Sequence, residues 1–194
     1  MSIVFVRECD TVRAMLNKYS KIISSILLLI AISVIGQSHV VSAATVTSNL
    51  PASLYIPKIS KNIPVIPVGV TFTNVLDVPH NFVQAGWYKA GPLPGEIGSA
   101  VLDGHVDNGA TVPGVFKNLY TLTVGDDIYI TQKSGNILHF KVIATTILKR
   151  TASSAAIFAN SGVPLLKIIT CFGTFVPKDK TYDQRLVVTA LLLG

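Results

Sequence analysis

From residue 45 onward the sequence consists of short apolar runs separated by Gly, Pro, Asn and Asp, and this pattern constrains the fold most. Short runs with turn-forming residues at this spacing are typical of an all-β sandwich or barrel. The clearest local signal is KSGN at residues 133–136, which separates two strand-like runs and predicts a β-hairpin. No internal repeat or second domain is evident. The pattern therefore predicts one all-β domain over residues 45–194 and leaves sandwich and barrel open.

The individual elements are assigned by residue range. Strands are expected at residues 53–59, 63–70, 99–106, 127–132, 137–148, 164–172 and 184–193. Residues 153–160 predict one or two helical turns.

Residues 22–36 form an uncharged apolar run that ends before the predicted domain. The preceding segment is basic, with Arg7, Arg13, Lys18 and Lys21. A basic flank, an apolar run and the small residues at 41–44 are typical of an export signal. The run is shorter than the roughly 20 residues that cross a bilayer, although extension to residue 41 would make a span. We expect residues 1–44 to form a cytoplasmic tail plus a signal, cleaved near Ala43, or a retained membrane anchor; both remain open.

The charge of the chain restricts its partners. The formal net charge is +6, and only 13% of residues are charged. The basic residues form no run interleaved with aromatic residues, so the sequence disfavours nucleic acid as a partner. A negatively charged membrane or cell wall fits a thinly spread positive charge better.

Export makes the cysteine content informative. The chain has two cysteines, Cys9 and Cys171, and Cys9 precedes the apolar run. If residues 45–194 are exported, Cys171 has no intramolecular partner for a disulfide. It is then either a small buried hydrophobic residue or a reactive thiol.

Alternation along the strands predicts where Cys171 points. In the strand at 164–172, Cys171 shares a face with Lys167, and the lysine indicates that this face is exposed to solvent. Cys171 is therefore predicted at the outward-facing end of its strand. The same reasoning directs Arg185 outward and places His105 on one face with Val101. These reactive side chains are expected in a surface groove outside an aliphatic core.

Four blocks of sequence, in this order, resemble a sortase of the class F type. They are AVLDGHVDN (100–108), PGVFKNLYTLTVGDDIYI (113–130), LLKIITCFGTF (165–175) and YDQRLVVTALL (182–192). The resemblance spans about residues 53–193. It implies a closed eight-stranded β-barrel with one or two short helices and a cysteine transpeptidase that acts outside the bacterial membrane. The implied site is Cys171 as nucleophile, His105 as proton donor and acceptor, and Arg185 for the oxyanion or substrate positioning.

The chemistry of these residue types agrees with this assignment. Amide cleavage with transfer needs a nucleophile, a proton donor for the leaving amine and a group that stabilises the oxyanion. A thiol is only partly ionised at neutral pH, and a neighbouring cation raises its thiolate fraction. Arg185 keeps its charge, so it is a donor rather than a base. No cofactor or metal is expected, because the histidines and the exported cysteine lack ligand spacing.

The resemblance also implies the substrates and the location. The expected reaction cleaves an LPxTG-like sorting signal between Thr and Gly through a thioacyl-enzyme intermediate and transfers the acyl group to an amine. The expected partners are surface proteins with a C-terminal sorting signal, a peptidoglycan precursor or pilin lysine as the amine, and the membrane. The domain is expected on the extracellular face of the plasma membrane or secreted. Wall anchoring and pilus assembly both remain open.

Two alternatives come from other classes. A non-catalytic exported β-barrel that binds the wall has the same composition and differs only in lacking a reactive Cys171. A cysteine transpeptidase that forms peptidoglycan cross-links should carry an arginine two residues after its nucleophile, but Gly173 stands there.

Several other residues have two interpretations. Asp103 and Asp107 flank His105 and could either orient its ring or cap the loop. Arg150 is either a solvated residue or part of the groove. Trp87 and Tyr88 either wall the groove or pack in the core.

Overall fold

The computed structural model describes residues 48–72, 75–109 and 112–194. The predicted tail, the apolar run and the cleavage site near Ala43 lie outside the described residues. Within the described ranges, no helix has the length and apolar character needed to cross a membrane.

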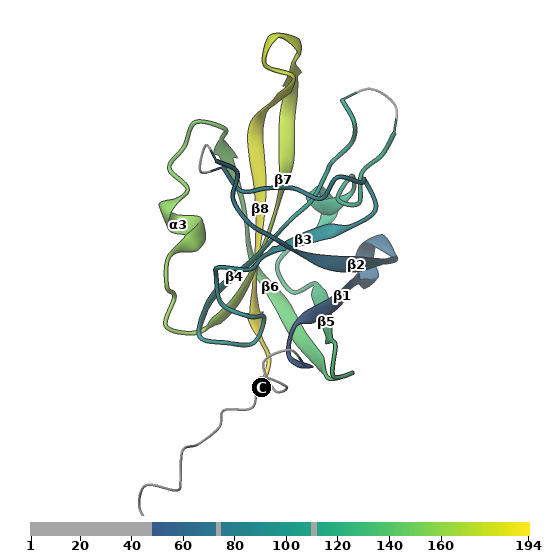
Figure 1. Cartoon of the computed structure of the whole chain (residues 1–194), viewed down its shortest axis with the longest axis vertical. Helices are drawn as coiled ribbons and strands as arrows, with labels where there is room; N and C mark the ends of the chain where they lie inside the picture. The colour runs from purple at the N-terminus through teal and green to yellow at the C-terminus, as the bar shows by residue number, and fades with distance from the viewer. Residues whose placement is uncertain (1–47, 73–74, 110–111) are drawn as a thin grey trace, which may run out of the picture. The chain divides into compact units, whose positions relative to one another are not determined.

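The described part of the chain contains eight strands, one short α-helix and three 3-10 helices (Figure 1). The strands are β1 (Pro51–Ile56), β2 (Lys61–Val68), β3 (Ala85–Tyr88), β4 (Gly98–Asp103), β5 (Asp127–Gln132), β6 (Ile137–Lys149), β7 (Pro164–Val176) and β8 (Thr181–Leu192). The helices are η1 (Pro57–Ile59), η2 (Leu119–Thr121), α3 (Ala155–Phe158) and η3 (Pro177–Asp179).

The strands close into a barrel in the order β1-β2-β3-β4-β7-β8-β6-β5, with β1 paired to β5. The pairs β2/β3 and β4/β7 are parallel, and the other pairs are antiparallel. The prediction of an all-β, closed eight-stranded barrel is therefore confirmed. The predicted hairpin joins β5 to β6, where Gly135 supplies the positive φ of 87° that the turn requires.

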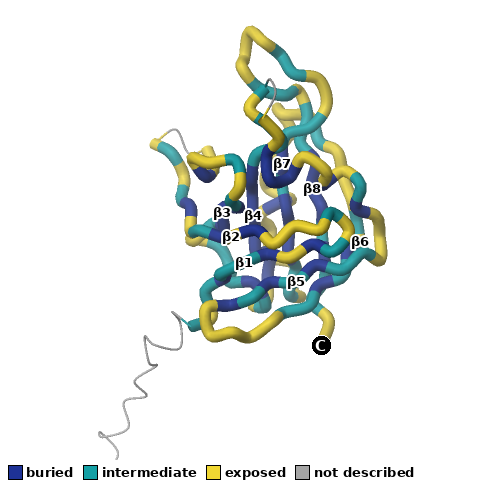
Figure 2. Tube along the Cα trace, turned by 90° about the vertical axis from the view of Figure 1, so that its right-hand side faces the viewer, coloured by how far each residue is buried: buried dark blue, intermediate teal, exposed yellow. Residues whose placement is uncertain are grey.

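The barrel interior is filled by alternate residues of the strands, as Figure 2 shows by the buried segments. Fully buried side chains include Leu54, Ile56, Leu102, Ile128, Ile130, Phe140, Leu166 and Ile168. Phe116 and Leu119 in the β4–β5 connection are also fully buried in this core. The interior is largely aliphatic, as the sequence predicted, and it also contains the aromatic rings of Trp87, Phe116 and Phe140.

The outer face of β4, β7 and β8 is covered rather than solvated. Val101 and Val187 form a second buried cluster there with Ile157 of α3. Lys167 is only 9% exposed, and its Nζ donates hydrogen bonds to the carbonyl oxygens of Ala156 (2.7 Å) and Ile157 (3.1 Å). The prediction that Lys167 marks a solvent face is wrong, because a long stem can carry an ammonium group to backbone acceptors beneath a covering segment.

The β7–β8 hairpin extends well past Cys171. It projects at the upper end of the view in Figure 1, and its pairing continues to Val176↔Thr181 after a bulge between Phe172 and Phe175. Gly173 lies in this bulge with φ of 88°, which only glycine adopts without strain. Cys171 faces outward as predicted, but it lies inside a strand and not at the end of one.

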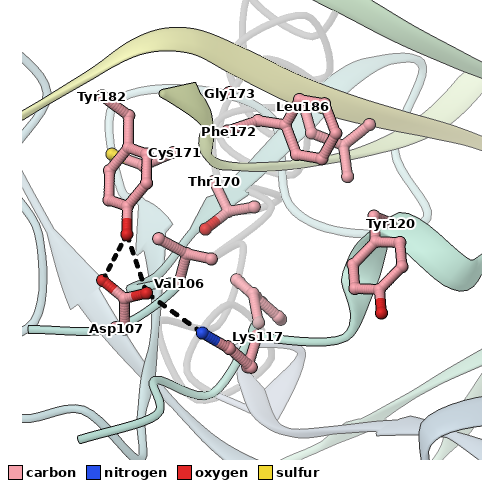
Figure 3. Close-up of a pocket in the computed structure, with 11 residues that line it drawn as sticks. Val106, Asp107, Lys117, Tyr120, Thr170, Cys171, Phe172, Gly173, Tyr182 and Leu186 are labelled. Carbon is pink, nitrogen blue, oxygen red and sulfur yellow. Dashed lines mark hydrogen bonds and ion pairs between the residues drawn. The ribbon is translucent and has the colours of Figure 1, made fainter. Parts of the chain in front are cut away.

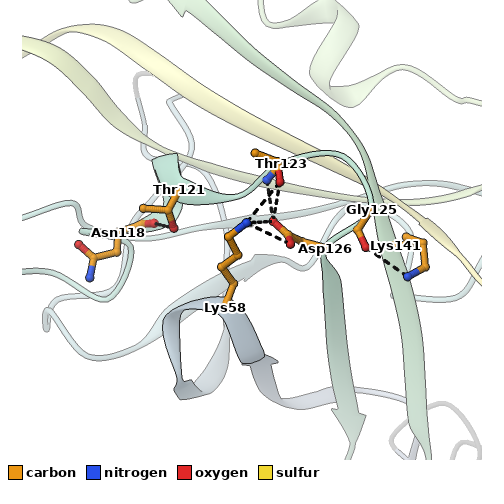
Figure 4. Close-up of polar contacts among 7 residues, drawn as sticks. All are labelled: Lys58, Asn118, Thr121, Thr123, Gly125, Asp126 and Lys141. Carbon is orange, nitrogen blue, oxygen red and sulfur yellow. Dashed lines mark hydrogen bonds and ion pairs between the residues drawn. The ribbon is translucent and has the colours of Figure 1, made fainter.

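The connection from β4 to β5, residues 104–126, is fixed at both ends. At its start, Thr170 Oγ1 of β7 donates a buried hydrogen bond of 2.8 Å to the carbonyl oxygen of Gly104. At its end, Asp126 forms an ion pair of 3.0 Å with Lys58 and accepts a hydrogen bond from the main-chain N–H of Thr123 (Figure 4). The segment that carries His105 is therefore tied to the barrel at both ends.

The sequence did not predict β3. Its Trp87 is buried in the barrel core and donates from Nε1 to the carbonyl oxygen of Pro92 at 3.1 Å. Tyr88 packs edge-on against Phe158 of α3, with ring centroids 5.4 Å apart. The structure therefore decides for core packing of Trp87.

Candidate active site

Cys171 and Arg185 lie directly opposite each other on the antiparallel strands β7 and β8. Directly opposite residues share a face, with Cβ atoms about 5 Å apart. The two residues therefore lie side by side on the outer face, where the sequence placed each of them separately.

His105 approaches the same place from β4. Asp103 at the end of β4 pairs with Ile169 of the parallel strand β7. His105 lies two residues after Asp103, and Cys171 lies two residues after Ile169. The hydrogen bond from Thr170 to Gly104 holds the residues immediately before them together. The topology therefore brings the three predicted site residues to one end of adjacent strands β4, β7 and β8.

The ring of His105 is held by the β2–β3 connection. Its Nε2 lies 2.8 Å from the carbonyl oxygen of Pro79, and its ring packs on Phe82 with a centroid distance of 4.5 Å. A carbonyl oxygen only accepts hydrogen bonds, so Nε2 carries the hydrogen. In the neutral ring, Nδ1 then has a free lone pair.

Arg185 is anchored on its own strand. Nη1 donates to the carbonyl oxygens of Tyr182 (3.0 Å) and Gln184 (2.7 Å), and Nη2 donates to Thr181 Oγ1 (3.3 Å). Among the described residues, Nε–H and the second N–H of Nη2 have no partner. Arg185 is therefore fixed in place and still has donors for a ligand.

A pocket of about 230 Å³ opens beside Cys171 (Figure 3). Its walls come from the β4–β5 connection and the β7–β8 hairpin, and its apolar lining consists of Val106, Phe116, Phe172 and Leu186. His105 and Arg185 do not line it.

A polar group closes one side of this pocket. Asp107 accepts hydrogen bonds from the hydroxyl of Tyr182 at 2.8 Å and from the main-chain N–H of Gly109, and it forms an ion pair of 3.2 Å with Lys117. Burial alone would raise the pKa of Asp107, but these donors hold it below its ordinary value. Burial and the hydrogen bond to Asp107, with the charges of Asp107 and Cys171, raise the pKa of Tyr182 to about 12. Tyr182 is therefore a permanent donor, and Asp107 a permanent acceptor, near neutral pH.

Neither aspartate that flanks His105 is hydrogen-bonded to its ring. Asp107 caps its own loop through Gly109, which is the second interpretation given above. Asp103 is 5% exposed, and within the described part of the chain its Oδ1 has no hydrogen-bond partner. Burial, followed by the negative charge of Asp77, raises the pKa of Asp103 to about 8. Asp103 is therefore a largely protonated buried acid near neutral pH.

The remaining sequence candidates lie elsewhere. Arg150 forms an exposed ion pair of 2.6 Å with Asp179 in η3 and does not line the pocket. In the described ranges, no group of three or more His, Cys, Asp or Glu side chains is arranged to hold a metal ion.

Comparison with known proteins identifies the family. A family model described as the sortase domain matches residues 54–193, which is most of the chain. The chain belongs to the sortase family. Sortases are cysteine transpeptidases, so the fold and the general chemistry implied by the sequence resemblance agree with this match. A search of curated proteins found no match.

Solved sortase structures share the fold at low sequence identity. Sortase C1 of GBS pilus island 1 is 23% identical with a TM-score of 0.57, and the alignment covers 73% of this chain and 63% of that one. Sortase C-1 from Actinomyces oris is 24% identical with a TM-score of 0.59, covering 73% of each chain. Sortase A from Corynebacterium diphtheriae is 23% identical with a TM-score of 0.57, covering 75% of this chain and 61% of that one. The chain thus spans less than two thirds of the length of two of these sortases.

Sequence reasoning missed the residues that surround the site in space. Pro79 and Phe82, which hold His105, lie 26 and 23 positions before it in the chain. Tyr182 stands in the last block of the resemblance and offered no sign of its contact with Asp107, 75 positions away. A signal existed only for Asp107, which was noted as a neighbour of His105.

Proposed function

We propose that this sortase is a transpeptidase that cleaves an LPxTG-like sorting signal between Thr and Gly and transfers the acyl group to an amine. Cys171 is the nucleophile, His105 exchanges the protons, and Arg185 stabilises the oxyanion or positions a substrate carbonyl. The proposal is supported by the pairing of Cys171 with Arg185 on one face, where Cys171 lines a pocket and two N–H groups of Arg185 have no partner among the described residues.

The reaction has two halves. Cys171 transfers its thiol proton to His105, and Sγ attacks the threonine carbonyl carbon. The developing oxyanion accepts hydrogen bonds from the N–H groups of Arg185 that have no partner among the described residues. Collapse of the tetrahedral intermediate breaks the Thr–Gly bond and leaves a thioester on Sγ, while the departing glycine nitrogen takes a proton from His105. An incoming amine then attacks the thioester and loses a proton to His105. Water in place of the amine gives hydrolysis.

The contacts of His105 favour one nitrogen for these proton transfers. Nε2–H donates to the carbonyl oxygen of Pro79. Nδ1 is the nitrogen without a partner among the described residues. We therefore assign the exchanged proton to Nδ1, with Nε2–H remaining on Pro79 throughout the reaction.

Substrates and location follow from this reaction. The acyl donors are surface proteins with a C-terminal sorting signal, and the acceptor is an amine such as a peptidoglycan precursor or a pilin lysine. Such donors are presented outside the cell, so the domain works on the extracellular face of the membrane. Residues 22–41, with the basic residues before them, would anchor it there.

The test is incubation of the full-length protein with a library of LPxTG-type peptides and several amines, read by mass spectrometry. We expect cleavage after threonine and an amide product with the accepted amine. The variant Cys171→Ala should fold and give neither product, because replacing a half-buried thiol by a methyl group removes little buried area.

Two results would contradict the proposal. Cleavage that persists in folded Cys171→Ala protein would reject the nucleophile. Absence of cleavage, together with a Cys171 that iodoacetamide does not modify at neutral pH, would favour the non-catalytic binding module.

A further inference from the structure

Tyr182 contacts both halves of the candidate site. Its hydroxyl donates to the carboxylate of Asp107, lying 2.8 Å from each oxygen, and its carbonyl oxygen accepts a hydrogen bond of 3.0 Å from Arg185 Nη1. Figure 3 shows its hydroxyl directed toward the carboxylate of Asp107. Phe175 supports the ring edge-on, with centroids 5.4 Å apart. One residue therefore links the segment that carries His105 to the strands that carry Cys171 and Arg185.

The acceptor of this link is itself fixed. The Asp107 side chain is 10% exposed and is held by Gly109 N–H and Lys117 Nζ. Asp107 also forms an isolated β-bridge with Pro113 across its loop. A donor that is bound to this carboxylate is therefore attached to the β4–β5 connection.

The β7–β8 hairpin needs such an attachment, because it continues beyond the last pair of β4 with β7, Asp103↔Ile169. The hairpin is also attached at η3 and β8, where Arg150 forms an ion pair with Asp179 and donates its main-chain N–H to the carbonyl oxygen of Asp183. The hydrogen bond of Tyr182 to Asp107 fixes the side of the hairpin that lines the pocket.

We propose that Tyr182 is a positioning residue that, through its hydrogen bond to Asp107, sets the distance between His105 and the Cys171–Arg185 pair. This inference rests on the proposed function of those residues. The hydrogen bond from Thr170 to Gly104 holds the base of the same two segments, so loss of the Tyr182 hydroxyl should loosen the site without unfolding the barrel.

The test is Tyr182→Phe, which retains the ring and removes only the hydroxyl. We expect kcat to fall by roughly 10- to 100-fold with little change in KM, because small misplacements of catalytic groups cost about this much. In substrate-free protein, iodoacetamide should alkylate Cys171 at a changed rate, because the pocket wall beside the thiol is no longer held by the hydrogen bond to Asp107. The matched control is Tyr55→Phe, which removes an exposed hydroxyl on β1 far along the barrel wall and should change neither quantity.

A second variant tests whether the fall in kcat results from loss of the hydrogen bond between Tyr182 and Asp107. Asp107→Ala removes the acceptor instead of the donor and should also lower kcat. If the hydrogen bond carries the effect, adding Tyr182→Phe to Asp107→Ala should cause no further loss, since coupled residues are not additive. Asp107→Ala also takes the place of Tyr182→Phe if that variant does not fold.

The outcomes separate this inference from the proposed function. If the wild type transfers peptides and Tyr182→Phe does so equally well with an unchanged alkylation profile, the inference is wrong and the function stands. A lowered melting temperature with unchanged kcat and alkylation would show a purely structural role and would also overturn it. If the wild type transfers nothing, the proposed function fails, and the alkylation profiles of the two proteins still decide whether Tyr182 positions the site.

Discussion

Replacing Asp103 by Asn is expected to stabilise the barrel at neutral and alkaline pH. The carboxyl of Asp103 is buried at the end of β4, its Oδ1 has no hydrogen-bond partner among the described residues, and Asp77 adds a negative charge nearby. These conditions raise its pKa from 3.8 to about 8. Asparagine is a neutral side chain of nearly the same shape, so it reproduces the protonated acid at every pH.

The direction of the effect follows from proton binding. Between pH 4 and 8 the unfolded chain has released this proton and the folded chain retains it, so the folded state binds more protons. The free energy of unfolding therefore falls as pH rises through this range. Since each pH unit is worth about 1.4 kcal/mol, the full span corresponds to roughly 6 kcal/mol, which is lost once the pH exceeds about 8.

Equilibrium unfolding in urea from about pH 5 to pH 9 measures this contribution. Three other carboxyl groups titrate below this window, because hydrogen bonds and ion pairs outweigh the opposing effect of burial and keep the pKa values of Asp126, Asp127 and Asp107 below the ordinary value. The wild type should lose stability across this window, and Asp103→Asn should remain nearly constant. Asp77→Asn is the matched control and should show a smaller slope than the wild type, because it removes one cause of the raised pKa.

Parallel curves of unfolding free energy against pH for the wild type and Asp103→Asn would contradict this prediction. A variant that is less stable than the wild type at about pH 9 would do so as well, because it would mean that the ionised carboxylate is well accommodated in the fold.

Three further predictions concern the site and the leader. Arg185→Lys should lower the transfer rate by roughly 100- to 1000-fold, as loss of an oxyanion donor does. It should lower the free energy of unfolding by only about 1–2 kcal/mol, because the hydrogen bonds that Arg185 makes on its own strand are lost. A folded variant with normal turnover would reject the oxyanion role. Gly114→Ala should lower the free energy of unfolding in urea by about 1–3 kcal/mol, because a Cβ at this position would collide with the main-chain oxygen of His105. The control Gly69→Ala has room for its Cβ and should lower the free energy of unfolding less. Full-length protein with an uncleaved leader should sediment with the membrane fraction through residues 22–41, and an intact N-terminus in a soluble cytoplasmic pool would contradict the predicted location.

Local patterns predicted most of the elements. The turn at residues 133–136 and the helical turn of α3 occur where the sequence placed them, and β5 has the predicted bounds. These elements depend on neighbours in the chain, namely turn-forming residues and the alternation of side chains. β3 was missed because it is only four residues long and consists of Ala85, Gly86, Trp87 and Tyr88, which show no alternation of polar and apolar character.

Lys167 shows the limit of the alternation argument. The period of two correctly separated the faces of β7, with Leu166 and Ile168 in the core and Cys171 outside. It could not show that the outer face is itself covered by α3. The covering segment meets β7 only in the folded chain, so a buried lysine was taken for an exposed one.

Strand periodicity and turns predicted an all-β domain. The order of the sequence blocks resembled a sortase and so implied the closed barrel and the roles of Cys171, His105 and Arg185, because these signals are encoded by residues close together in the chain. The folded structure was needed to show the pairing of Cys171 with Arg185, the hydrogen bond from His105 to Pro79, and the hydrogen bond from Tyr182 to Asp107. These contacts join residues far apart in sequence, and their geometry depends on the register of the closed barrel. Barrel closure fixes that register through the packing of all the strands together, which no single stretch of sequence specifies.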